Sequence, residues 1–415
     1  MMEQDKSDKK YTDAVAQGHY DIYRGGLSGH YDNVRIYWED QIRGIRFRPY
    51  LKRLVDRKKR AGSKVRIVDL GAGTGEGLRL LTSWLREEPD LRVNQTKVLP
   101  YDMIEVYEGC DLCQAMVNHG GSIFADRPNV NFRRADFSRG FPLKAEKPFD
   151  IYFCSYGSLS HIDDQNMENL LREIVEHAGD KALVVGEWLG RHSIEWPCYW
   201  SQPGSEMLDY SMSWISTSSE SEDEPEHFPM RFWLGEEICS LVNQVARETS
   251  TKITILDLYD CSIFTGRHVD TNEYNEWVTH IRAAVNRLHE SNVRTDLETL
   301  IAEVNPVPGH DELNRYFEQL RSSWNQLVTY CRIRLERRCH PVQTRRWQTF
   351  HPALQMAIMT LDRVIDNVSW MQMGDPRANI VEPQLGYALR GLEVELGQGK
   401  GRGHALIGIF EIHKA

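Results

Sequence analysis

A short glycine-rich turn constrains the fold of this chain more than any other stretch. Residues 65–77 read VRIVDLGAGTGEG, an apolar run that stops at Asp69 and continues into four glycines within seven residues. A buried strand that leads through such a turn into a helix is the opening unit of a parallel α/β sheet. The turn could hold the phosphates of a nucleotide, hold a cofactor without phosphates, or serve only as a tight connection.

Strand and helix patterns alternate after this turn. Strands that alternate with helices predict βαβ units, a parallel sheet and right-handed crossovers. We expect strands at 65–70, 104–110, 129–134, 149–154, 181–188, 252–264 and 404–415, and helices at 76–87, 112–119, 164–177 and 234–248.

Three segments lie outside the alternating core. Residues 1–60 combine aromatic residues with helical spacing and are interpreted as an N-terminal helical cap. Residues 191–230 are aromatic and then acidic, and their polar part, 211–229, is expected to be an exposed loop that forms a lid. Apolar residues recur at three or four positions within 271–396, which indicates a helical insertion. The core itself then comprises residues 61–190, 231–270 and 397–415.

Composition narrows the compartment and the partner. A formal net charge of −10 opposes a nucleic-acid backbone as the main partner, because phosphate binding requires clustered Lys and Arg. No apolar run reaches the roughly 20 residues that cross a bilayer. The charged start, MMEQDKSDKK, is not followed by the apolar core of a secretory signal. We therefore expect a cytoplasmic protein without a membrane segment.

The cysteines give no metal site. All eight are expected to be free thiols in this compartment. Cys110 and Cys113 form a C-x-x-C pair, but no second pair stands at the spacing of zinc ligands.

The glycine turn fails both common phosphate-binding patterns. When the dinucleotide pattern G-x-G-x-x-G is aligned on Gly71 and Gly73, Glu76 occupies the position of the third glycine. The G-K-[ST] of a phosphate loop is absent. Asp69 beside the turn would repel a pyrophosphate but suits a cationic or hydroxyl-bearing ligand. The turn therefore indicates a cofactor without phosphates.

Four segments, taken in order, are similar to the motifs of one enzyme family. VDLGAGTG resembles the first motif of class I S-adenosylmethionine (SAM)-dependent methyltransferases, and EGCDL, RRADF and FDIYFCSYGSLSHI look like the motifs that follow it. The match covers about half of the chain, and its motifs resemble most those of the small-molecule methyltransferases. It implies an α/β fold with a Rossmann-like, seven-stranded, doubly wound sheet whose last strand is antiparallel.

The resemblance also implies where SAM binds, with S-adenosylhomocysteine (SAH) as the product. Asp111 would accept hydrogen bonds from the ribose hydroxyls, with Glu105 and Glu108 as rival positions. Asp136 would receive the adenine amine, and Phe137 would pack on the ring. The complete implied cofactor set is Asp69, Gly71, Ala72, Gly73, Asp111, Leu112, Met116, Asp136, Phe137, Cys154, Ser155 and Tyr156.

Candidate catalytic residues follow the expected strand ends. Methyl transfer needs an aligned nucleophile, exclusion of water and, for some acceptors, removal of a proton. His161 is interpreted as a general base or an acceptor-orienting group, with a packing or capping histidine as the structural alternative. Glu187 could bind an amine or fix Arg267. Arg267 could clamp a carboxylate or form a structural ion pair.

Aromatic residues around the expected site are candidate acceptor contacts. Tyr31, Trp38, Trp188 and His268 are expected to bind the substrate. Aromatic faces suit a planar, apolar or cationic acceptor, or they could only attach a lid to the sheet. The wider aromatic set comprises Tyr20, Tyr23, Trp196, Tyr199, Trp200, Tyr210 and Trp214.

The helical insertion separates the expected sixth and seventh strands. It leaves the ligand-binding edge of the sheet, so it could cover the substrate or form a structural bundle that mediates a homodimer. The chain as a whole is predicted to transfer the SAM methyl group to nitrogen, oxygen or activated carbon of a small metabolite, plausibly in specialised metabolism. A protein or peptide methyltransferase and a non-methylating user of SAM, such as a cyclase or a regulatory binder, are the alternatives.

Overall fold

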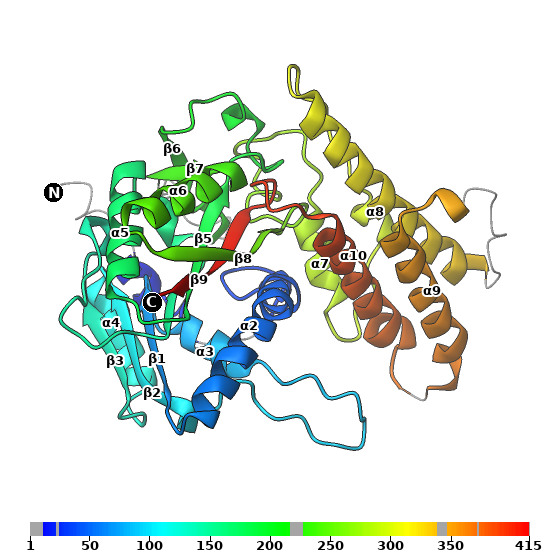
Figure 1. Cartoon of the computed structure of the whole chain (residues 1–415). Helices are drawn as coiled ribbons and strands as arrows, with labels where there is room; N and C mark the ends of the chain where they lie inside the picture. Colours follow the sequence, from blue (N-terminus) through cyan, green and yellow to red (C-terminus); the bar gives the residue numbers. More distant parts are fainter. Residues whose placement is uncertain (1–10, 22–24, 216–226, 338–346, 372, 415) are drawn as a thin grey trace.

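A mixed β-sheet forms the centre of the computed structural model, which describes residues 11–21, 25–215, 227–337, 347–371 and 373–414 (Figure 1). Seven of the described strands follow the order β3-β2-β1-β4-β5-β9-β8, as their pairings show. They are β1 (Val65–Leu70), β2 (Ile104–Asp111), β3 (Val130–Arg134), β4 (Ile151–Cys154), β5 (Ala182–Gly190), β8 (Lys252–Cys261) and β9 (Ala405–His413).

The first five of these strands are parallel and β9 is antiparallel. Strand β9 lies between β5 and β8, so that Phe410 pairs with Val184 on one side and with Ile255 on the other. This arrangement confirms the expected α/β fold class, with a doubly wound sheet and an antiparallel last strand.

Alternate residues of each strand bury opposite faces of the sheet. Ile67 and Val185 pack toward helices α2 (Asp40–Arg60) and α3 (Glu76–Ser83), whereas their neighbours Val68 and Val184 pack toward the other face. That second face is covered by α5 (Asp164–His177) and α6 (Gly235–Glu248). Helix α4 (Gln114–Ile123) connects β2 with β3. The period-2 alternation of the strands thus produces three layers around two apolar cores.

A hairpin extends the sheet where the sequence predicted an exposed loop. Strands β6 (Met207–Ser211) and β7 (His227–Trp233) pair antiparallel, and β7 continues beside Leu189 and Gly190 of β5 beyond the end of β4. The prediction of an exposed loop over 211–229 is therefore wrong at both of its described ends, because Ser211 ends β6, residues 227–229 begin β7, and Ser211 and Phe228 are buried. The middle of that stretch, 216–226, lies outside the described residues.

The insertion between β8 and β9 is helical, as expected. It contains α7 (Ile281–Leu288), α8 (Asp311–Arg337), α9 (Pro352–Asn367), the π-helical turn η10 (Arg377–Val381) and α10 (Glu382–Leu396). In Figure 1, α8, α9 and α10 lie together to one side of the sheet. The exposed Met356 and Met359 lie on α9, and a homodimer through the insertion stays a prediction.

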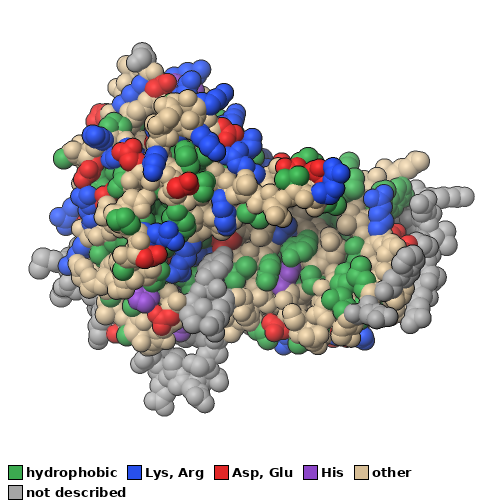
Figure 2. Space-filling view, turned by 90° about the horizontal axis from the view of Figure 1, so that it is seen from below, with side chains coloured by type: hydrophobic (Ala, Val, Ile, Leu, Met, Phe, Trp, Pro, Cys, Tyr) green, Lys and Arg blue, Asp and Glu red, His purple; other side chains and the backbone are tan. Residues whose placement is uncertain are grey.

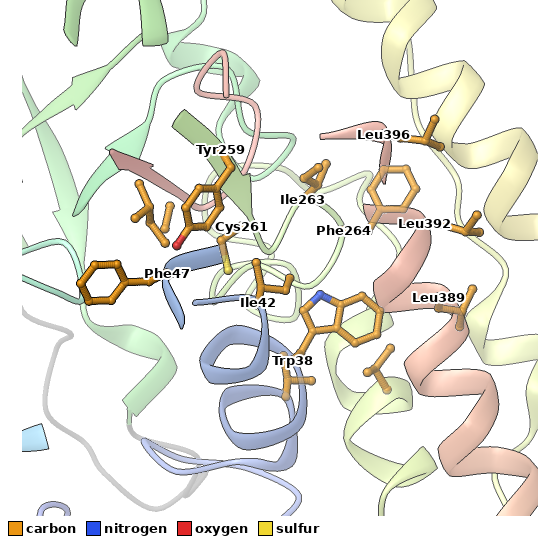
Figure 3. Packing of buried hydrophobic residues seen from close by; sticks show 14 of the residues in the cluster. Trp38, Ile42, Phe47, Tyr259, Cys261, Ile263, Phe264, Leu389, Leu392 and Leu396 are labelled. Carbon is orange, nitrogen blue, oxygen red and sulfur yellow. The ribbon is translucent and has the colours of Figure 1, made fainter. Parts of the chain in front are cut away.

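One tryptophan joins the cap, the sheet and the insertion. Trp38 lies in the π-helical turn η1 (Arg35–Glu39), between Ile42 of α2 and Leu389 of α10 (Figure 3). The centre of its ring lies 5.8 Å from that of Trp324 on α8. Its Nε1 donates a 2.7 Å hydrogen bond to Glu393 of α10. The backbone nitrogen of Phe264, just after β8, donates to the other oxygen of Glu393. The insertion is therefore continuous with the main core, and its buried residues belong to the same apolar cluster as those of the sheet.

One face of the molecule has a hollow (Figure 2). In Figure 2, hydrophobic side chains gather near a hollow in the middle of the face that is seen from below. None of the helices among the described residues is long and apolar enough to cross a membrane.

Replacing Trp38 should weaken the whole fold. The Trp38→Ala variant leaves a cavity and removes one donor from buried Glu393, so we expect the free energy of unfolding to fall by about 3–5 kcal/mol. Chemical denaturation measures this loss. Trp277 is 70% exposed, and Trp277→Ala is the matched control that should change stability by less than about 0.5 kcal/mol. Equal losses in the two variants would contradict the role assigned to Trp38.

Candidate active site

A cavity of about 420 Å³ opens at the carboxyl edge of the sheet. The turns after β1, β2, β3 and β4 supply its floor, and residues of the β6–β7 hairpin cover it. Tyr11 and Tyr20 close part of the remaining side. Ligands of open α/β sheets bind at this edge, because the loops that follow parallel strands converge there.

The glycine turn borders the cavity in a conformation that favours glycine. Gly71, Gly73 and Gly75 have φ values of 75°, 52° and 93°. A Cβ on Gly71 would stand 2.6 Å from the side chain of Ser158, whereas a Cβ on Gly73 would meet nothing within 4 Å. Backbone is therefore exposed to the cavity at Gly73, which fits a ligand that approaches the main chain closely.

Asp111 organises the turn from the next strand. One of its carboxylate oxygens accepts a 2.8 Å hydrogen bond from the nitrogen of Gly73, and the other accepts from the nitrogen of Cys113. Asp111 also lines the cavity, unlike its two rivals. Glu105 is exposed and paired with Arg66, and Glu108 is buried and paired with Arg133. The geometry thus leaves Asp111 as the carboxylate of β2 that can reach a ligand.

Most of the residues expected around the cofactor lie together on this wall. Asp136 accepts hydrogen bonds from both the nitrogen and the hydroxyl of Ser138, which fixes the turn that carries Phe137. The expected cofactor residues that line the cavity are Gly71, Ala72, Gly73, Asp111, Leu112, Met116, Asp136, Phe137, Ser155 and Tyr156.

Asp69 and Cys154 do not reach the cavity. Asp69 is completely buried, and it accepts a 2.6 Å hydrogen bond from the hydroxyl of Tyr107. Gly77 of α3 passes so closely that a Cβ there would stand 2.2 Å from the carboxylate. Burial raises the pKa of Asp69 to about 7. Both side chains are buried in the core and lie outside the cavity lining, which corrects their expected place in direct contact with a ligand.

Charged side chains of the N-terminal helix form the opposite wall. Arg35, Glu39 and Arg43 follow one another at intervals of four, and all three are buried and line the cavity. Arg43 makes a bidentate ion pair with Glu187 of β5, at 2.6 and 3.0 Å. Glu39 accepts from Arg267 at 3.0 Å. Each of these buried charges therefore has a partner from a distant part of the chain.

Glu76 gathers three donors at the start of α3. Its carboxylate is bonded by His30 at 2.9 Å, by Arg35 at 3.1 Å and by the hydroxyl of Tyr31. Burial alone would raise the pKa of Glu76, but His30 and Arg35 outweigh burial and hold that pKa well below its ordinary value. An ionised carboxylate therefore stands at the end of the glycine turn, in the position where a dinucleotide site has its third glycine.

The three expected catalytic residues all line the cavity, in different settings. Glu187 is paired with Arg43 and not with Arg267, so it does not fix Arg267 as one interpretation required. The guanidinium of Arg267 lies 4.7 Å from the ring centre of Trp214 and is engaged by Glu39. The ring of His161 lies edge-on to that of Phe228, with 5.8 Å between the ring centres. Desolvation by the surrounding protein lowers the pKa of His161, although its side chain is exposed toward the cavity.

The four expected substrate contacts lie outside the lining. Tyr31 acts through Glu76, and His268 stands behind Tyr210, with the two ring centres 5.0 Å apart. Trp38 belongs to the core of the insertion. Trp188 points to the α5–α6 face because it follows Glu187 in the strand, and successive residues of a strand alternate between faces. The structure does not support direct acceptor contact by Trp38 or Trp188. Tyr23 lies outside the described residues.

Several lining residues escaped the sequence analysis. The interval of four among Arg35, Glu39 and Arg43 was a usable signal, because it places charges on one helical face. Met230 was hidden because residues 191–230 were expected to form a lid loop, whereas Tyr210 already belonged to the wider aromatic set. His404 directly precedes β9 and has no local pattern that marks it. Among the described residues, no group of His, Cys, Asp and Glu is arranged to hold a metal ion.

Removing the Asp111 carboxylate should weaken binding of the cofactor that the sequence implies. Asp111→Asn keeps the shape of the side chain but removes the charged acceptor, so SAH affinity should fall by about 1–3 kcal/mol. Isothermal titration calorimetry measures the change. Glu105→Gln is the matched control and should bind SAH as the wild type does. Unchanged affinity in Asp111→Asn would contradict the assignment.

A comparison with family models matches part of this chain. Residues 101–180 match a family model described as a methyltransferase domain. No curated protein sequence matches the chain significantly.

Three solved structures are among those that a structural comparison matches to this chain. A SAM-dependent methyltransferase from Clostridium acetobutylicum is 15% identical over 51% of this chain and 83% of its own, with a TM-score of 0.33. The DhpI–SAM–HEP complex is 12% identical over 61% of this chain and 91% of its own, with a TM-score of 0.35. The [4+2]-cyclase SpnF is 12% identical over 88% of this chain and 80% of its own, with a TM-score of 0.33. Scores this low carry no argument about function.

Proposed function

We propose that this chain is a class I SAM-dependent methyltransferase and that it transfers the methyl group of SAM to nitrogen, oxygen or activated carbon of a small molecule. The observation that carries the proposal is one continuous cavity, which extends from the glycine turn to the β6–β7 hairpin. Cofactor and acceptor would meet inside it, and SAH would leave as the product.

We call the part of the cavity beside the turns after β1, β2 and β3 the cofactor half. Its polar groups suit SAM because they match a ribose, an adenine and an amino acid, none of which carries a phosphate. Asp111 would accept hydrogen bonds from the ribose, and Phe137 would pack against the adenine beside Asp136. Ionised Glu76, with Arg35 next to it, would face the ammonium and carboxylate of the methionine part. SAM supplies an electrophilic methyl group, and the surrounding protein has only to align the acceptor and exclude water.

We call the part of the cavity beside the β6–β7 hairpin and the end of β5 the acceptor half. It favours a small molecule over a polypeptide. Tyr210, Met212 and Met230 of the hairpin region cover the cavity, and the volume falls in the range of about 300–1,000 Å³ that small-molecule sites occupy. A polypeptide acceptor would need an open groove that passes through the site. His161 and the ion-paired Glu187 would line this half, where His161 can orient the acceptor through its exposed ring.

The direct test follows the label of methyl-labelled SAM. The purified chain is incubated with a panel of small phenols, amines and carboxylic acids, and separately with peptides and whole protein. We expect label in one small-molecule class, with one SAH formed for each methyl transferred. Label in peptide would favour the protein methyltransferase. Release of methylthioadenosine, or acceptor rearrangement without SAH, would favour a non-methylating use of SAM and contradict the proposal.

A further inference from the structure

Besides His30 and His161, the cavity is lined by His404, which the sequence did not indicate. His404 stands at the entry of β9, where the next residue, Ala405, pairs with Leu189 of β5. His404, Ala405 and Leu189 all line the acceptor half of the cavity. His404 therefore lies beside the carboxyl end of β5, the strand that carries Glu187.

A buried carboxylate holds this imidazole from behind. Glu195 is completely buried, and its oxygens lie 2.9 and 3.1 Å from Nδ1 of His404. The backbone nitrogen of His268 and the hydroxyl of Ser193 also donate to Glu195. A Cβ on Gly266 would stand 2.1 Å from the carboxylate carbon, so only a glycine leaves room for Glu195 there. Burial would raise the pKa of Glu195, but His404 and the other donors outweigh burial and lower it.

This arrangement assigns the tautomer of His404. An ionised carboxylate only accepts hydrogen bonds, so Nδ1 of His404 carries the hydrogen and Nε2 of the neutral ring carries a lone pair. Nε2 makes no hydrogen bond with any residue in the described part of the chain. A carboxylate that orients an imidazole and stabilises its protonated form is the arrangement that general-base catalysis requires.

His161 lacks this support. No hydrogen bond joins either of its ring nitrogens to a described residue, and its closest ring neighbour is the apolar Phe228. No carboxylate among the described residues would stabilise a proton gained by His161. The third histidine of the lining, His30, is bonded through Nε2 to Glu76 beside the glycine turn, and its Nδ1 is buried without a partner among the described residues. Among the histidines near the β6–β7 hairpin, His404 is thus the one that is prepared to take a proton.

The walls of the acceptor half indicate an uncharged ligand. Arg43 is engaged by Glu187 and Arg267 by Glu39, so these charges of the cavity wall are already paired. A carboxylate or ammonium acceptor would have to compete with these ion pairs. The remaining surface is apolar or aromatic, and it is formed by Leu189, Tyr210, Met212, Trp214 and Met230.

From this geometry we infer that the acceptor is an uncharged, apolar molecule with an acidic hydroxyl, a phenol or an enol, and that the His404–Glu195 pair takes its proton. The inference rests on the proposed function and deepens it to O-methylation. A neutral amine attacks with its own lone pair, whereas a phenol becomes a strong nucleophile only as its anion. A histidine held by a buried carboxylate can therefore act as the base that removes the proton of a phenol.

The step balances without any further reactant. The hydroxyl proton passes to Nε2 of His404, and the oxygen forms a bond to the methyl carbon. The bond between that carbon and sulfur breaks, and its electron pair stays on sulfur, which becomes the neutral thioether of SAH. The imidazolium of His404, paired with Glu195, then releases the proton to water when the products leave.

A chromogenic phenol tests the proton transfer separately from turnover. With SAH bound, 4-nitrophenol is titrated into the wild type below its solution pKa, and the visible band of its anion is recorded. We expect the band in the wild type and in the exposed control His280→Asn, and its loss in His404→Asn. Persistence of the band in His404→Asn, or its loss in His161→Asn alone, overturns the inference. So does the absence of the band in the wild type with both 4-nitrophenol and 7-hydroxycoumarin.

Turnover with the same phenols gives the second measurement. His404→Asn should lower kcat about 10²–10⁴-fold, and Glu195→Gln should lower it less but move the pH profile. The groups that face His404 are Glu195, His268 and Tyr210, with Arg267 in the same cavity, so His268→Gln controls for a contribution of its ring to that profile.

The affinity for SAH distinguishes the two levels of failure. We expect it to be unchanged in His404→Asn and Glu195→Gln, whereas the unfolding temperature of both variants should fall because one partner of the buried pair is lost. If SAH binds but amines are methylated in place of phenols, the inference fails and the proposed function stands. If SAH does not bind to the wild type, the proposed function itself fails.

Discussion

Buried ion pairs between the N-terminal helix and the rest of the chain hold the site together. Arg35 reaches Glu76 beside the glycine turn, and Arg43 reaches Glu187 on β5. Glu39 is shared by two arginines. Arg267 follows β8, and Arg282 lies in α7. A buried charge that loses its partner costs several kcal/mol, so these contacts can exist only when cap, sheet and insertion are assembled. The cavity is therefore a property of the complete fold.

The same assembly explains why three additions surround an ordinary α/β core. The cap supplies charged walls, the β6–β7 hairpin supplies an apolar cover, and the insertion fixes the cap through Trp38, Trp324 and Glu393. The loops of the core alone would offer a cofactor edge that is open to water. With the additions, the acceptor half becomes enclosed and electrically balanced, which suits a reaction that needs alignment and exclusion of water more than a set of reactive side chains.

Features encoded locally could be predicted from the sequence, and features that depend on distant partners could not. The strands and the glycine turn follow from apolar runs and breaks, so 65–70 and the helix at 164–177 agree with the structure to the residue. The hairpin was missed because its strands lie on either side of an acidic stretch. Trp188 looked like a ligand contact because a single-strand pattern does not tell which face it uses. The pair of His404 and Glu195 joins residues more than 200 positions apart, and no spacing reveals it.

The central claim is that the glycine turn holds a phosphate-free sulfonium cofactor beside an acceptor cavity. Calorimetric titration of the purified chain with SAM and, separately, with NADH tests it most directly. The account predicts a single SAM site with micromolar affinity, about −8 kcal/mol, and no heat of binding with NADH. Binding of NADH, or of neither compound, would contradict it.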